Sequence, residues 1–108
     1  MNPYFSATIL NGEYQSGIMT LPSDTYLNSL YVPSEIVGSS LLFFGDFGDG
    51  TMRQLNFTFD LTSTDPYYKG QVVGDLQGKF AGLRSLQFST TSSDLQTEDI
   101  VILGGYAF

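Results

Sequence analysis

The fold is decided by the stretch Lys79-Phe80-Ala81-Gly82-Leu83-Arg84-Ser85-Leu86-Gln87-Phe88-Ser89-Thr90, in which a short turn at 79–82 leads into a strand. Leu86 and Phe88 share one side of that strand and define its core-facing side. The same alternation places Arg84 on this side, where a guanidinium must reach the rim of the core or find buried acceptors. We expect either a rim arginine paired with a carboxylate or an arginine that binds a partner.

Alternating apolar and polar residues recur along the chain, most clearly over 52–61, and this period predicts strands rather than helices. About eight short segments of this kind, separated by turns, predict one all-β domain over residues 1–108. We expect an antiparallel β-sandwich, and a jelly roll fits the connections better than an immunoglobulin topology. The expected strands cover residues 4–10, 15–21, 25–32, 40–44, 52–61, 67–73, 84–90 and 100–103.

Two segments near the ends of the chain predict a hairpin and a C-terminal tail. Asn11-Gly12 is the strongest hairpin signal, because both positions of such a turn favour positive φ. It predicts that 4–10 pairs with 15–21. Residues 104–108 contain two glycines and two rings. They predict a short C-terminal tail that either folds back on the core or docks on a neighbour.

The composition narrows the class of protein. The chain has 11 acidic and 4 basic residues and a net charge of −7, so phosphate backbones would be repelled and we expect no nucleic-acid partner. It contains no histidine or cysteine, which leaves only carboxylates for catalysis. The carboxylates considered lie in or beside turns, where Asp is common for local reasons, so we expect no enzyme, no catalytic residue and no cofactor. They are Asp46, Asp49, Asp60 and Asp65.

The sequence also bears on location. No run approaches the roughly 20 apolar residues that a membrane-spanning helix needs. The first residues lack the basic and apolar regions of a secretory signal. We therefore expect a protein that is made in a cytoplasm and does not bind membranes.

The loop Gly45–Gly50 leaves two alternatives open. Oxygen ligands on a glycine-rich loop suit a hard cation, which makes Asp46 and Asp49 weak candidates for a calcium site. Their spacing does not match an EF-hand. The other interpretation, which we favour, is a hairpin connection with Asp49-Gly50 at its tip.

Several aromatic residues are candidates for partner contacts. The run Leu41–Phe44 predicts either a strand covered on both faces or a strand that presents rings at an interface. Tyr67-Tyr68 lies in a loop as a ring pair, and we expect these rings to pack over the end of the sandwich or at a subunit contact. The full set of partner-binding candidates is Phe43, Phe44, Tyr67, Tyr68, Arg84, Tyr106 and Phe108.

The order of motifs along the chain resembles a family of small tailed-phage virion structural proteins. The residues that carry this resemblance are Asn11-Gly12, Ser16-Gly17, Pro33, Leu41–Phe43, Asp49-Gly50, Phe80-Ala81-Gly82-Leu83-Arg84 and Gln96. The chain departs from the pattern at Ser85, where an aromatic is expected, and at Ser89-Thr90-Thr91, where Ser-Gly-Thr is expected.

The resemblance implies a protein of the virion, assembled in the host cytoplasm. It implies a capsid decoration or cement subunit, or else a head–tail or tail component. The implied partners are the major capsid protein or other virion proteins, with a homotrimer favoured. Arg84 would serve as an organising charge in these contacts.

A carbohydrate-binding module is the alternative from another class of function. Tyr67-Tyr68 could stack on a sugar ring while Asp65 forms hydrogen bonds to it. The absence of tryptophan counts against this alternative.

Overall fold

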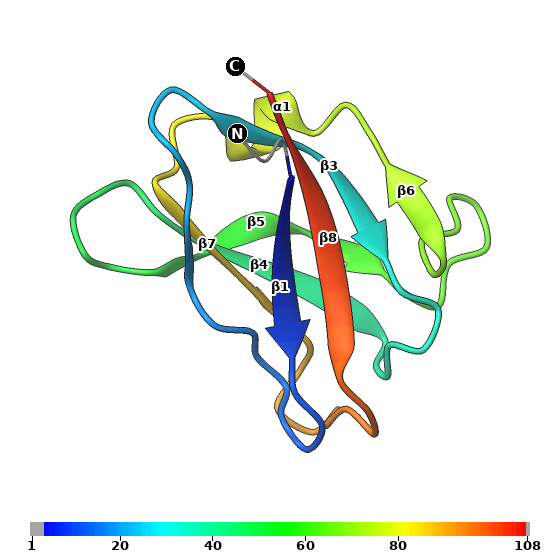
Figure 1. Cartoon of the computed structure of the whole chain (residues 1–108). Helices are drawn as coiled ribbons and strands as arrows, with labels where there is room; N and C mark the ends of the chain where they lie inside the picture. Colours follow the sequence, from blue (N-terminus) through cyan, green and yellow to red (C-terminus); the bar gives the residue numbers. More distant parts are fainter. Residues whose placement is uncertain (1–3, 108) are drawn as a thin grey trace.

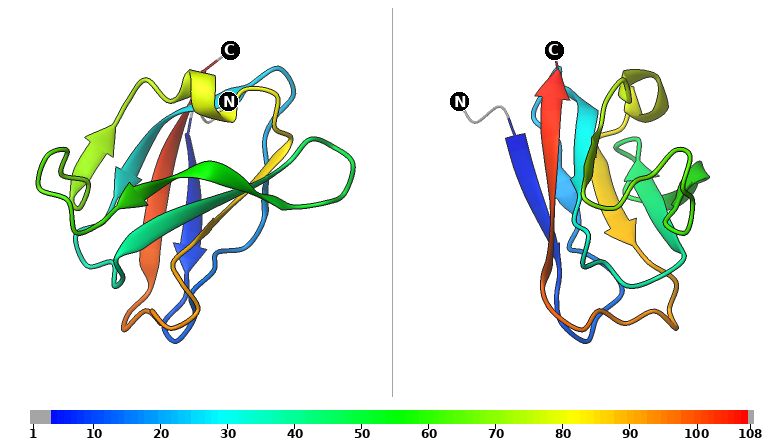
Figure 2. Two further views of the ribbon diagram at one scale, coloured as in Figure 1. Left: turned by 180° about the vertical axis from the view of Figure 1, so that it is seen from behind. Right: turned by 90° about the vertical axis from the view of Figure 1, so that its right-hand side faces the viewer.

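The computed structural model describes residues 4–107, which form two antiparallel four-stranded sheets packed face to face (Figure 1). The edge-on view in Figure 2 shows the two layers. The first sheet has the order β1-β8-β3-β6, with β1 (Tyr4–Ile9), β8 (Ile100–Ala107), β3 (Tyr26–Val32) and β6 (Gln71–Val73). The second has the order β2-β7-β4-β5, with β2 (Met19–Thr20), β7 (Ser85–Ser89), β4 (Ser40–Asp46) and β5 (Arg53–Asp60).

The predicted all-β antiparallel sandwich is confirmed. The strand order in both sheets is compatible with a jelly roll, because all neighbouring strands except the hairpin pair β4 and β5 come from distant parts of the chain. The single helical turn α1 (Gln77–Phe80) lies at the end of the sandwich near the C-terminus (Figure 1). No helix within residues 4–107 is long and apolar enough to cross a membrane.

The hairpin predicted at Asn11-Gly12 is wrong, although the turn itself is present. Gly12 has a φ of 85°, but Asn11 does not have the positive φ that the pattern predicts for both positions. However, β1 pairs with β8, and Gln15 forms a bridge with Ser89 of the opposite sheet. The turn therefore moves the chain from one sheet to the other instead of reversing it within a sheet.

Residues 104–107, predicted to belong to a tail that folds back on the core or docks on a neighbour, continue the last strand and pack on the core. Residues up to Ala107 belong to β8, which pairs with β1 on one side and β3 on the other. Gly104 lies beneath the ring of Phe5, where a Cβ atom would meet that ring at 2.2 Å and Leu27 at 2.9 Å. The glycine thus lets the strand continue under a large ring. Phe108 lies outside the described residues.

Phe43 occupies the centre of the core. Its side chain is fully buried, and its ring centroid lies 5.0 Å from Phe57, 4.9 Å from Phe59, 5.5 Å from Phe80 and 5.7 Å from Phe88. The prediction that Phe43 contacts a partner is therefore wrong, because the ring has no surface to offer. The sequence could not decide this, since four consecutive apolar residues give no contrast between the two faces of a strand.

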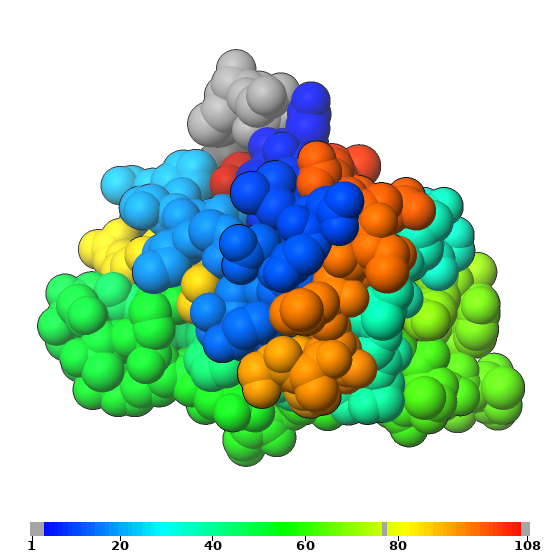
Figure 3. Space-filling model, turned by 90° about the horizontal axis from the view of Figure 1, so that it is seen from below, coloured from blue at the N-terminus to red at the C-terminus, as the bar shows by residue number. Residues whose placement is uncertain are grey.

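The segments after β1 and before β8 close the lower end of the sandwich, where Figure 3 shows them in contact (blue and orange). Gly12 N–H donates to the carbonyl of Gln96 at 2.8 Å, and Gln96 N–H donates to the carbonyl of Glu13 at 2.9 Å. The buried Gln96 amide also accepts from the N–H of Val37 at 2.8 Å and donates to the carbonyl of Val37 at 2.9 Å. Gln96 therefore joins three loops, and this structural role explains why its polar side chain is buried.

The position of Phe43 gives a prediction with a matched control in the next residue. Phe43→Ala should lower the free energy of unfolding by about 3–5 kcal/mol, because it leaves a cavity among four rings. Phe44 faces outward and is half-buried between Gln54 and Gln87 of the flanking strands, so Phe44→Ala should cost clearly less. Equilibrium urea unfolding of both variants tests this, and equal losses would show that Phe43 is not the centre of the core.

Candidate functional site

The outer face of the sheet β1-β8-β3-β6 is the strongest candidate for a functional surface. Its strands contain none of the 11 acidic and 4 basic residues of the chain, and we call it the uncharged face. Large apolar side chains are exposed on it, with 51% of Tyr4, 71% of Val72, 42% of Val101 and 40% of Leu103 accessible. Contiguous exposed apolar side chains mark interaction sites more often than isolated ones do.

Strand register brings these side chains together from distant parts of the sequence. Leu103 lies opposite Ser6 on one side and Tyr31 on the other, and Tyr31 lies opposite Val72. The row from Ser6 to Val72 thus crosses all four strands. Since side chains directly opposite each other in a sheet are in contact distance, the row forms a continuous surface.

A shallow groove of about 220 Å³ lies on this face between Tyr4, Tyr31, Val72 and Leu103. Its floor is Gly104-Gly105 of β8. A Cβ atom on Gly105 would lie 2.5 Å from the Ser29 hydroxyl. Because Gly105 has no side chain, nothing fills the groove at this point. The groove therefore depends on Gly105, which faces outward without a side chain between two tyrosines.

The outer face of the other sheet is polar by comparison. β5 carries Arg53 and Asp60 at its ends and exposes Gln54, Asn56 and Thr58 between them. Antiparallel sheets often have one solvated face of this kind. The two outer faces therefore differ in chemistry, and the uncharged face is the one that lacks the features of a solvated sheet.

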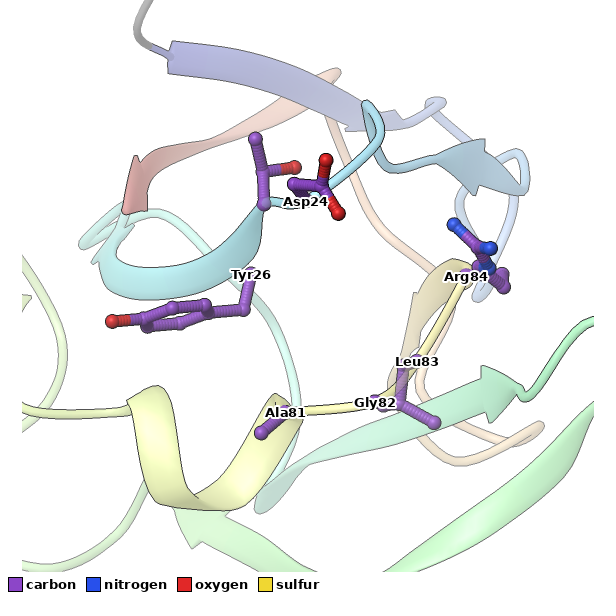
Figure 4. A pocket seen from close by; sticks show the side chains of 7 residues that line it. Asp24, Tyr26, Ala81, Gly82, Leu83 and Arg84 are labelled. Carbon is purple, nitrogen blue, oxygen red and sulfur yellow. The ribbon is translucent and has the colours of Figure 1, made fainter. Parts of the chain in front are cut away.

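A second opening, of about 500 Å³, lies at the end of the sandwich between the start of β3 and the segment after α1 (Figure 4). It is lined by Asp24, Thr25, Tyr26 and the segment 81–84. Figure 4 shows Tyr26 and Arg84 on opposite sides of the opening. It offers a guanidinium, a carboxylate and a hydroxyl, but these groups stand at an open rim.

The predicted orientation of Arg84 is wrong. Leu83 is buried and Arg84 is exposed, because β7 begins only at Ser85 and the alternation does not extend back through the turn. Leu83 lies against Gly45, where an added Cβ atom would meet it at 2.8 Å. Within residues 4–107, the only ion pair is Arg53–Asp49, so the rim ion pair expected for Arg84 is not formed there.

Asp46 and Asp49 organise the loop between β4 and β5. The Oδ1 atom of Asp46 accepts from the N–H groups of Gly48 at 2.7 Å and Asp49 at 3.1 Å. Asp49 pairs with Arg53 at 2.8 Å, and its hydrogen bond with this guanidinium is the main cause that lowers the pKa of Asp49 to about 2. No group of three His, Cys, Asp or Glu side chains that could hold a metal occurs in the described part of the chain.

The Asp49–Arg53 pair gives a titration prediction. Arg53→Gln should raise the pKa of Asp49 from about 2 toward 3.8, measured by NMR titration of the side-chain carboxyl. Because the folded pKa is the lower one, the pair stabilises the fold above pH 3.8, and that contribution is lost as the pH falls toward about 2.

Asp60 is the internal control for this titration. Its pKa is lowered by the hydroxyl and the N–H of Thr62, at 2.6 Å and 3.0 Å, and not by Arg53. It should keep its pKa in the variant. An unchanged pKa of Asp49 in Arg53→Gln would contradict the assigned cause.

The aromatic residues predicted to bind partners do not form one surface. Tyr68 stacks on Phe59 with centroids 4.4 Å apart, so Tyr67-Tyr68 forms no ring platform, although Tyr67 is exposed. Tyr106 faces inward against Phe5 at 5.3 Å, and burial raises the pKa of its hydroxyl. Phe44 remains half-exposed on the polar face.

Sequence reasoning missed Tyr4, Tyr31, Val72 and Leu103. A signal was present, because Val101 and Leu103 alternate with the buried Ile100 and Ile102 and give β8 two apolar faces. The four residues belong to four different strands, so only the strand order shows that they meet.

A scan against protein-family models finds no match, and a search of curated proteins finds none either.

Proposed function

We propose that this chain is a non-enzymatic structural protein of a virus particle, a decoration or cement subunit that binds the shell through its uncharged face. The observation that carries the proposal is the absence of charge from a whole exposed sheet in a chain of net charge −7. The order of sequence motifs, which resembles that of small tailed-phage virion proteins, supports the choice of a virion.

Burial of the uncharged face explains how such a subunit would bind. Tyr4, Val72, Val101 and Leu103 would leave water on contact, at a gain of roughly 25 cal/mol per Å² of apolar surface. Depletion of charge at the centre with polar groups at the rim is the usual anatomy of a protein interface. A single contact of this kind need not be strong, because many copies on one particle reinforce one another.

Charged groups would contribute orientation. The acidic residues of the chain lie outside the uncharged face, with Asp75 just after β6 and Asp99 just before β8. A shell protein with an apolar patch bordered by Lys or Arg would complement this arrangement. Charges at the rim of an interface act mainly on the rate and specificity of association.

A charge placed on the uncharged face tests the proposal. Val72→Glu should abolish binding of the purified protein to virus particles of its own source that lack it, because the glutamate would be buried without a partner. Val72 is 71% exposed, so the fold should tolerate the change. Thr58→Glu, which adds the same charge to the exposed outer face of β5, is the matched control and should bind normally. Cosedimentation with particles measures both variants.

Three outcomes would overturn the proposal. One is the absence of the protein from particles purified from its own source, judged by mass spectrometry. Another is equal binding by the Val72→Glu and Thr58→Glu variants. The third is the carbohydrate-binding alternative, which the groove between Tyr4 and Tyr31 favours as a place for a sugar ring. In that case a glycan array would show binding that Val72→Glu reduces, while particles bind neither protein.

A further inference from the structure

The four free sheet edges of the molecule are not equivalent. β2 has two residues and β6 has three, and short edge strands offer little to pair with. β5 is long, but it carries Arg53 at its start and Asp60 at its end, and charges discourage pairing with a neighbour. β1 combines six residues with no charge and no proline. It is therefore the one edge among the described strands that lacks these protective features.

The backbone of β1 is available along that edge. Within residues 4–107, β1 pairs with β8 only, and no hydrogen bond from another segment covers its other side. In an antiparallel ladder, alternate residues direct their N–H and C=O groups to each side. The groups on the outer side of β1 therefore remain for a further strand.

We propose that two copies of this chain associate by antiparallel pairing of β1 with β1 of the second copy, across a two-fold axis at Ser6. The two sheets β1-β8-β3-β6 would then join into one continuous sheet. This inference deepens the proposed function, because the uncharged faces of the two paired copies would lie side by side as one larger surface for the shell. It replaces the three-fold arrangement that the motif resemblance implies.

The distribution of charge favours a second copy of this chain as the partner of the β1 edge. Each chain carries a net charge of −7, so most surfaces of two copies repel each other. The uncharged face and the β1 edge bring no charged strand residue of either copy to the contact. An antiparallel edge is also complementary to itself, since a two-fold axis gives each N–H group a C=O partner on the other copy.

The side chains of β1 fit this register. With the axis at Ser6, Tyr4 of one copy lies opposite Thr8 of the other, and both face outward. Pairs of an aromatic and a β-branched residue are favourable opposite each other. The row through Leu103 ends at Ser6, which would meet Ser6 of the second copy at the seam, and the exposed ring of Tyr4 would gain Thr8 as a neighbour.

The mass of the protein in solution is the first test. Analytical ultracentrifugation over a concentration series should show a species of twice the single-chain mass of 11.9 kDa. Ser6→Lys adds an exposed charge to the edge and should return the protein to the single-chain mass, whereas Thr58→Lys on β5 should not. Matching urea midpoints would show that both variants keep the fold.

A cysteine crosslink tests the register. The chain has no cysteine, so Ser6→Cys introduces a single thiol. Residues directly opposite each other in an antiparallel pair have Cα atoms about 4.5–5.5 Å apart, which is within reach of a disulfide. Mild oxidation should convert most of this variant to a covalent dimer, and Thr58→Cys should crosslink far less.

The outcomes distinguish failure of this inference from failure of the proposed function. A single-chain mass at all concentrations, a trimer, or a dimer that Ser6→Lys leaves intact and Ser6→Cys does not crosslink would each overturn the inference. Binding of a single-chain species to particles would overturn the inference and keep the proposed function. A crosslinked dimer without particle binding would keep the inference and overturn the proposed function.

Discussion

The structure depends on a chain of aromatic contacts that crosses the sandwich from one sheet to the other. Phe5 of β1 stacks on Phe88 of β7 with centroids 6.1 Å apart, and Phe88 meets Phe43 edge to face at 5.7 Å. Phe43 in turn contacts Phe80, which brings α1 into the core. Large rings bury much area per residue, so a small domain can be held by few of them. This explains how a chain of 108 residues without disulfides or tryptophan fills its interior.

The ring packing also shapes the outside of the molecule. Phe5 covers Gly104 so closely that no side chain fits there, and the next residue, Gly105, faces outward against Ser29. Adjacent residues of a strand face opposite sides, so one glycine serves the core and the other serves the surface. The groove between Tyr4 and Tyr31 therefore lies directly behind the contact that orders the interior.

The fold was predictable because apolar alternation has a period of two wherever one side of a strand is buried. The segment 52–61 and the strand after Arg84 both show this, and both are strands in the structure. It was harder to predict which face of a strand a given residue lies on than to predict that the strand exists. Arg84 precedes the first residue of β7, so the alternation read backward from Leu86 placed it on the wrong side.

The candidate site was less predictable because it depends on strand order. Asn11-Gly12 indicated a local hairpin, yet long-range pairing with β8 and β7 determines the course of the chain there. The run Leu41–Phe44 contained one core ring and one outer ring, and nothing local distinguishes Phe43 from Phe44. The uncharged face is assembled from four strands between Tyr4 and Ala107, and no window of sequence contains it.

The distribution of charge determines how copies of this chain would approach one another. The charges that sum to −7 lie in the loops, the second sheet and α1, and repulsion between copies acts over about 8 Å at physiological ionic strength. Apolar burial acts only at contact, after that repulsion has been overcome. Added salt weakens the repulsion without removing the gain from burial. Association through the uncharged face should therefore strengthen with ionic strength, whereas association through ion pairs would weaken. Because the charges lie apart from the apolar surface, repulsion opposes contact at the uncharged face until the two surfaces are close together.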